Sequence, residues 1–165
     1  MKIGVIIVCY NSQKTIKRCL ESIQKQSTLP DEVILVDGAS TDRTCEIVSS
    51  YESDLITLIS EPDAGIYDAM NKGLRLMNGE AFGFLNSDDC YNSEKTLSHL
   101  AAALSRSQIV SGHLLYLREH GDHSPVRIWK SETYQNGGFA RGFSLPHPTT
   151  YVRREVFDTV GYFNT

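Results

Sequence analysis

The stretch IGVIIVCY, residues 3–10, is an unbroken apolar run that ends on a tyrosine. Most of its members are β-branched, and β-branched residues favour strands. A strand that is apolar on both alternating faces is typical of a parallel sheet with helices on both sides. The stretch therefore predicts a central, buried strand near the start of the chain.

Outward from this run, apolar segments alternate with amphipathic ones over the first 106 residues. Further strands are expected within 32–40, 55–61 and 81–85. Helices are expected from a cap at Asn11 or Ser12 to about 26, from Thr41 or Asp42 to 50, and over 66–77 and 94–105. The third helix places Ile66, Met70, Leu74 and Met77 on one face, which predicts a core contact. This alternation indicates βα units and an open, mostly parallel α/β sheet with helices on both faces.

The pattern loosens after residue 107. Residues 108–118 and 125–130 are expected to form strands in an antiparallel or mixed extension of the sheet. Residues 134–150 are rich in Gly and Pro and predict loop, and 151–163 predict a short helix that enters a turn. We expect one domain over 1–165, with 107–165 as a looser second part.

Composition excludes several classes of function. The net charge is -4 and the pI is near 5.7, so no global attraction to nucleic acid is expected. The four cysteines show no C-x-x-C spacing, which favours free thiols in the cytoplasm. The apolar run at the N-terminus is short for a signal peptide, and no stretch approaches the roughly 20 apolar residues of a membrane helix.

Polar residues follow each predicted strand, and the carboxyl ends of parallel strands meet at one edge of a sheet, where α/β proteins bind ligands. An aromatic ring with several carboxylates there suits a ribonucleotide with a metal-bridged diphosphate. No G-x-G-x-x-G or Walker A motif follows the first strand, which argues against a dinucleotide enzyme and a P-loop ATPase. Taken alone, the adjacent Asp88 and Asp89 are equally typical of a solvated turn.

Four blocks of the chain resemble the nucleotide-site segments of inverting family 2 glycosyltransferases with the type A fold (GT-A). They are VIIVCYNSQKTIKRCLESIQKQS, DEVILVDGASTDRT, EPDAGIYDAMNKGL and FLNSDD, at residues 5–27, 31–44, 61–74 and 84–89. Their order and approximate spacing also match, and the resemblance covers essentially the whole chain. It implies that residues 1–106 bind the nucleotide and that 107–165 form part of the acceptor side.

The resemblance also assigns roles by position. It implies that Tyr10 borders the nucleotide base and that Asp37 hydrogen-bonds base or ribose. Asp63 and Asp68 fall where the family contacts base, ribose or donor sugar, and Lys72 follows on the same helix, where it would meet a phosphate. The alternatives are a rim aromatic for Tyr10, ordinary turn chemistry for Asp37 and a solvent-facing helix lysine for Lys72.

The acidic block resembles the D-x-D element that binds a divalent cation in this family. Asp88 matches its second acid and is expected to bind Mg²⁺ or Mn²⁺, with a direct, water-mediated or structural contact from Asp89. Asn86 replaces the first acid, so it removes a charge and keeps an acceptor. His147, held between two prolines, is expected near the acceptor or the diphosphate, with a structural loop histidine as the alternative.

The resemblance implies transfer of a sugar from a nucleoside-diphosphate sugar, UDP-linked by default, to a saccharide or lipid-linked saccharide in surface polysaccharide synthesis. Peripheral contact with the inner membrane face is implied too, with support from Arg118, Arg127, Arg141, Arg153 and Arg154. The family's catalytic base lies beyond a turn that matches 161–164, so we expect it after Thr165. The alternatives are a nucleotide-sugar binding or regulatory module without transfer activity and, less well supported, a nucleotidyltransferase.

Overall fold

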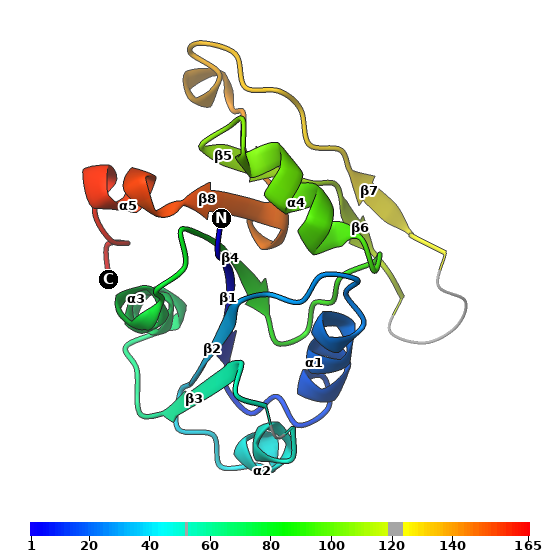
Figure 1. The fold of residues 1–165 in the computed structure, drawn as a ribbon, viewed down its shortest axis with the longest axis vertical. Helices are drawn as coiled ribbons and strands as arrows, with labels where there is room; N and C mark the ends of the chain where they lie inside the picture. Colours follow the sequence, from blue (N-terminus) through cyan, green and yellow to red (C-terminus); the bar gives the residue numbers. More distant parts are fainter. Residues whose placement is uncertain (52, 119–123) are drawn as a thin grey trace.

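A six-stranded sheet forms the centre of the molecule (Figure 1). The computed structural model describes residues 1–51, 53–118 and 124–165. The strands are β1 (Ile3–Cys9), β2 (Glu32–Asp37), β3 (Ile56–Ser60), β4 (Ala81–Asn86), β5 (Ile109–Ser111), β6 (Leu114–Tyr116), β7 (Arg127–Trp129) and β8 (Thr150–Arg153). The α-helices are α1 (Ile16–Gln24), α2 (Thr44–Ser49), α3 (Ile66–Leu76), α4 (Thr96–Leu104) and α5 (Arg154–Val160). Short 3-10 helices span Phe139–Arg141 and His147–Thr149.

The strand order is β3-β2-β1-β4-β8-β5, with β1 to β4 parallel and both β8 and β5 antiparallel to their neighbours. Every residue of β1 is buried, as its continuous apolar sequence predicts. The α/β fold with a mixed extension is therefore confirmed. The helix predicted over 151–163 was wrong in its first part, because residues 150–153 form a strand and only 154–160 are helical.

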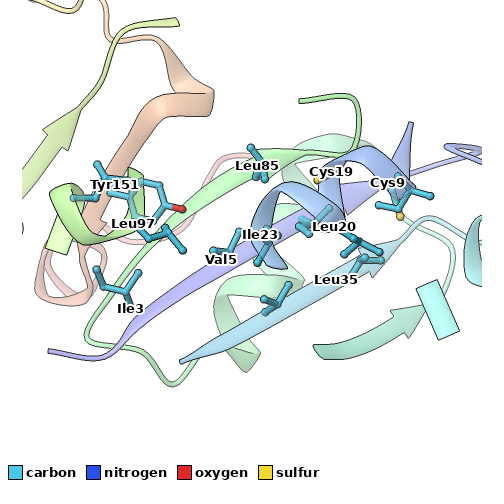
Figure 2. Close-up of a cluster of buried hydrophobic side chains, with 14 of the residues drawn as sticks. Ile3, Val5, Cys9, Cys19, Leu20, Ile23, Leu35, Leu85, Leu97 and Tyr151 are labelled. Carbon is cyan, nitrogen blue, oxygen red and sulfur yellow. The ribbon is translucent and has the colours of Figure 1, made fainter. Parts of the chain in front are cut away.

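Alternate residues of the central strands pack into two apolar layers. One layer joins Val5 and Ile7 of β1 to α1, α2 and α4, and the other joins Ile6 and Val8 to α3 and α5. Figure 1 shows α1 and α4 on one side of the sheet and α3 and α5 on the other. Figure 2 shows the first layer, in which Tyr151 of β8 lies beside Leu97 of α4. The predicted two-sided cover of the sheet is thus confirmed.

The first, second and fourth helices begin later than the sequence predicts, whereas α3 begins at residue 66 as predicted. α1 starts at Ile16, and the side chains of Asn11 and Ser12 do not cap it. Met70, Leu74 and Met77 lie in the core as predicted, but Ile66 is 51% exposed. Ile66 is the first residue of α3 and lies at the edge of the sheet, so the helical periodicity overstates how far the core extends.

The second part of the chain is less regular. β6 and β7 form a separate two-stranded sheet, and the rings of Tyr134, Phe139 and Phe143 contact one another in the loop that follows. Of the five arginines expected at a membrane face, Arg153 and Arg154 bond carbonyl oxygens next to the ends of α4 and α3, and Arg141 bonds the carbonyl oxygen of Asn136. None of the helices in the described ranges is long and apolar enough to cross a membrane.

Candidate functional site

A groove of about 850 Å³ lies at the carboxyl ends of β1 and β4. The end of β1 and its loop to α1 form one wall, and the loop before α3 and the first turn of α3 form another. Asp42 from the loop after β2 and residues 86–88 complete the lining. Open α/β sheets bind ligands at the carboxyl ends of their strands, at the point where the strand order reverses. In this sheet that point is β1, which lies between β2 and β4. The fold therefore places an open, polar-lined groove where the sequence predicts the site.

The groove gathers about half of the predicted site residues. Its lining includes Tyr10, Asp63, Asn86 and Asp88. The residues that do not line it are Asp37, Asp68, Lys72, Asp89 and His147. The first set can contact a ligand directly, whereas any ligand contact by the second set stays a prediction.

Tyr10 and Asp63 approach each other across Gly38. The ring of Tyr10 is 63% exposed, and Asp63 Oδ1 accepts a hydrogen bond from the backbone N–H of Gly65 at 2.9 Å. A Cβ atom on Gly38 would lie 2.5 Å from Asp63 Oδ2 and 3.5 Å from the Tyr10 ring. Glycine at position 38 therefore leaves the space in which a carboxylate and an open aromatic face stand side by side.

Asp37 is fully buried at the end of β2 and does not reach the groove. Its carboxylate accepts hydrogen bonds from the Ser40 backbone N–H at 2.8 Å, from the Ser40 hydroxyl, and from the Ser60 hydroxyl at 2.7 Å. Burial alone would raise the pKa of Asp37, but these hydrogen bonds outweigh it and hold the pKa below its usual value. In this geometry Asp37 fixes the loop after β2, and its predicted contact with base or ribose stays a prediction.

Side-chain hydrogen bonds join the loops after β1 and β2. Asn11 has a positive φ of 49°, and its backbone N–H donates to Ser40 Oγ at 2.7 Å. Its Oδ1 accepts from the Thr41 backbone N–H at 2.9 Å, and the Ser12 backbone N–H donates to Thr44 Oγ1 at 2.7 Å. The sequence predicted Asn11, Ser12 and Thr41 as possible helix starts, and it did not predict these contacts between the two loops. The missed signal was the matching run of short polar residues after two adjacent strands.

The 86–89 turn carries the acidic pair. Asp88 is exposed and lines the groove, and its backbone carbonyl accepts from Arg18 at 2.7 Å. Asp89 is half-buried, and its Oδ2 accepts from Asn86 Nδ2 at 3.1 Å. Burial and then the neighbouring Asp88 raise the pKa of Asp89 above its usual value. The two carboxylates therefore occupy different environments, and only Asp88 faces the groove.

The oxygen atoms at this turn suit a hard divalent cation. Across the described ranges, three or more His, Cys, Asp or Glu side chains nowhere come together to hold a metal. Mg²⁺ and Mn²⁺ commonly bind through one or two carboxylates, with the remaining ligands supplied by substrate phosphates and water. Asp88, the one carboxylate of this turn that lines the groove, therefore fits a cation that arrives with a diphosphate.

Lys72 and Asp68 brace the loop before α3. Lys72 Nζ donates to the Pro62 carbonyl at 2.7 Å and pairs with Glu61 at 2.9 Å and Asp68 at 3.5 Å. The hydrogen bond that Lys72 donates to the Glu61 carboxylate raises the pKa of Lys72 above its usual value. Asp68 also accepts from the Ala64 backbone N–H at 3.1 Å. Both side chains therefore hold the segment that carries Asp63.

His147 lies among aromatic rings rather than in the groove. Its ring is 5.5 Å from that of Phe84 and 6.3 Å from that of Phe163, measured between centroids. Burial against its surroundings lowers the pKa of His147. Asn71 of α3 exchanges two hydrogen bonds with the backbone of Phe163, at 2.9 and 3.0 Å. Phe163 is thus hydrogen-bonded to α3, and its ring contacts that of Phe84 on β4. Phe84 lies two residues before Asn86, where the acidic turn begins.

Solved structures share this fold. The chain superposes on the crystal structure of Staphylococcus aureus TarS 1-349 in complex with UDP-GlcNAc with a TM-score of 0.74 and 30% identity, over 99% of this chain and 49% of that one. It also superposes on the mannosyltransferase PcManGT from Pyrobaculum calidifontis in complex with GDP-Man and Mn²⁺, with a TM-score of 0.72 and 23% identity, over 99% of this chain and 47% of that one. These matches confirm the GT-A fold.

Sequence comparison agrees with the structures. A PGL/p-HBAD biosynthesis glycosyltransferase of Mycobacterium tuberculosis is 32% identical over 172 residues. That alignment covers 98% of this chain and 62% of the relative, so the chain spans less than two thirds of the relative's length. The family model described as glycosyl transferase family 2 matches residues 4–161. Because that match covers nearly the whole chain, the chain belongs to glycosyl transferase family 2.

Proposed function

We propose that this chain binds a nucleoside-diphosphate sugar in the groove and transfers the sugar to a hydroxyl acceptor with inversion at the anomeric carbon. The observation that carries the proposal is the convergence of Tyr10, Asp63 and Asp88 on one groove from three separate segments. An exposed ring offers a stacking surface for a base, and Asp63 offers an acceptor for hydroxyl or base N–H groups. Asp88 lies at the opposite wall, where a diphosphate would follow.

The relatives suggest which donor to test first. TarS was crystallised with UDP-GlcNAc and is a poly(ribitol-phosphate) β-N-acetylglucosaminyltransferase. By analogy we propose a UDP-sugar as the donor, and a saccharide or lipid-linked saccharide of a surface polysaccharide or glycolipid as the acceptor. We also propose that this transfer takes place at the inner face of the membrane.

We assign Asp88 as the protein ligand of a divalent cation, with Asn86 beside it. A bound Mg²⁺ or Mn²⁺ would offset the negative charge that develops on the departing nucleoside diphosphate. Asp88 would hold that cation from the protein side, and the joined loops after β1 and β2 keep Tyr10 facing the groove. Pre-positioned groups of this kind act without reorganising during the reaction.

We assign donor binding to residues 1–106 and part of the acceptor side to 107–165. His147 belongs to the acceptor side in this assignment. Inversion requires a carboxylate to take the acceptor's proton as its oxygen attacks. By the resemblance, that carboxylate follows the 161–164 turn, so no residue within 1–165 is assigned as the catalytic base.

Calorimetric titration tests the proposal. Wild-type protein is titrated with UDP, GDP, CDP and ADP, each with and without Mn²⁺. We expect one base to be preferred, Mn²⁺ to tighten its binding, and Asp88→Ala to abolish the effect of Mn²⁺. Asp158→Ala is the matched control, because Asp158 is an exposed carboxylate on α5 away from the groove lining. Equal, weak binding of all four nucleotides would argue against a nucleotide-sugar site.

A further inference from the structure

The two ends of the Asn86 carboxamide have different surroundings. Its Nδ2 donates to Asp89 Oδ2 at 3.1 Å. Its Oδ1 is buried and has no hydrogen-bond partner among the described residues. Native proteins seldom leave a buried acceptor unpaired, and such an atom calls for a specific explanation.

Asp89 determines which end of the carboxamide points where. An ionised carboxylate only accepts hydrogen bonds, so the NH₂ end of Asn86 must face Asp89. The carbonyl end is then forced to the other side. A backbone hydrogen bond from Asp89 N to Asn86 O at 3.0 Å closes the same turn, so the two residues are joined through main chain and side chain together.

Asp89 and Asp88 lie in different positions relative to the groove. Asn86 and Asp88 line the groove, whereas Asp89 does not and is half-buried behind them. A carboxylate in that position is poorly placed to reach a ligand. It is well placed to orient a side chain that does line the groove.

We propose that Asp89 is a positioning residue that holds the Asn86 carboxamide with its carbonyl oxygen as the acceptor for the bound nucleoside diphosphate. This inference rests on the proposed function. The ligand partner is an electropositive group, either a hydroxyl hydrogen or the accompanying cation. Because Oδ1 is covered by protein atoms, those atoms must shift slightly when the ligand reaches it. Ligand binding then supplies the hydrogen bond or coordination that the free protein lacks.

Two substitutions at one position separate positioning from metal binding. Asp89→Asn keeps a side-chain acceptor for Asn86 Nδ2 and removes the charge, whereas Asp89→Ala removes both. UDP affinity is measured by calorimetry with and without Mn²⁺, and Mn²⁺ affinity is measured alone. Thermal unfolding verifies that both variants are folded. The side-chain amide signals of Asn86 in an NMR spectrum of the free protein report its orientation without any ligand.

We expect Asp89→Ala to weaken UDP binding about tenfold, as for the loss of one orienting hydrogen bond, and Asp89→Asn to stay within about threefold of wild type. In an Asn86→Ala background, Asp89→Ala should have no further effect. The NMR signals of Asn86 should shift in Asp89→Ala far more than in Asp89→Asn. If Asp89→Ala weakens UDP binding equally with and without Mn²⁺, the partner of Asn86 Oδ1 is a hydroxyl. If Asp89→Ala weakens UDP binding only when Mn²⁺ is present, the partner is the cation.

Other results would overturn the inference. Equal loss in Asp89→Asn and Asp89→Ala, together with loss of Mn²⁺ binding in both, would make Asp89 a metal ligand. Unchanged Asn86 signals in Asp89→Ala would show that Asp89 does not hold the carboxamide. If wild type binds no nucleoside diphosphate while the Asn86 signals do depend on Asp89, the proposed function fails, and the ligand role of this pair fails with it.

Discussion

Residues 1–106 and 107–165 hold their structure in different ways. The first part has parallel strands of five to seven residues with helices on both faces, and its loops are joined by side-chain hydrogen bonds. The second part has strands of three or four residues, and large rings such as Phe139 lie 65% exposed. The comparison indicates that the first part fixes its groove by its own contacts, whereas the second part is held by its contacts with the first, through β8 and through the hydrogen bonds between Asn71 and Phe163.

Asp37 gives the strongest test of the first part. Asp37→Ala would leave the Ser40 backbone N–H and the Ser40 and Ser60 hydroxyls without their acceptor inside the fold. Breaking a buried network of this kind costs about 3 kcal/mol or more in the free energy of unfolding. Urea denaturation measures the loss. The exposed Asp158 of the second part is the control, and Asp158→Ala should change stability by less than about 0.5 kcal/mol.

Acid titration sharpens the same test. The pKa of Asp37 in the folded protein lies below its ordinary value, so its ionisation stabilises the fold above the unfolded pKa of about 3.9. That contribution is lost as the pH falls through the lower, folded pKa. The stability difference between wild type and Asp37→Asn should therefore be constant near neutral pH and shrink below about pH 4. A difference that stays unchanged down to pH 2 would contradict the assignment.

Gly38 tests whether the groove depends on close approach. In Gly38→Ala the new Cβ would lie 2.5 Å from Asp63 Oδ2, so that carboxylate must move out of its present position. We expect UDP affinity, measured by calorimetry, to fall about tenfold or more, because small displacements of positioned groups are costly. Gly112→Ala is the matched control in the second part, since its nearest neighbour would be Thr149 Cβ at an ordinary 3.8 Å. Equal effects of the two substitutions would remove the distinction.

Tyr151 tests the junction between the two parts. It is buried on β8 opposite Gly83 of β4, and its hydroxyl bonds that of Tyr91. Tyr151→Phe leaves the Tyr91 hydroxyl unpaired and should cost about 1–2 kcal/mol of unfolding free energy, measured by urea denaturation. The double variant with Tyr91→Phe should recover part of this loss because no orphaned hydroxyl remains. Additive losses would show that the pair does not join the parts.

The same contrast explains how much the sequence could predict. Long periodic segments identified β1 to β4 and α3, because burial on defined faces leaves a pattern in the residues themselves. β8 was missed because it has four residues and is a strand only through pairing with β4 and β5, which lie far away in the chain. At the site, the sequence predicted Tyr10, Asp63 and Asp88 after the ends of strands, and the structure places all three in the lining of the groove. The burial of Asp37 and the orientation of Asn86 depend on how each side chain is hydrogen-bonded within its folded loop, and the strand and helix periodicity of the sequence carries no signal of these contacts.

Substitution of Lys72 should change UDP affinity and stability least, and substitution of Lys14 provides the comparison. Lys14 lines the groove, whereas Lys72 Nζ is engaged with Pro62 and Glu61 and its side chain is only 17% exposed. Lys72→Met should therefore lower stability by less than about 1 kcal/mol and change UDP affinity by less than about twofold. Lys14→Met should weaken UDP more, and more strongly at low salt, since it removes a cation open to the diphosphate. If Lys72→Met instead gives the larger, salt-dependent loss, then Lys72 leaves the loop to meet the phosphates, and the first part is less fixed than its hydrogen bonds indicate.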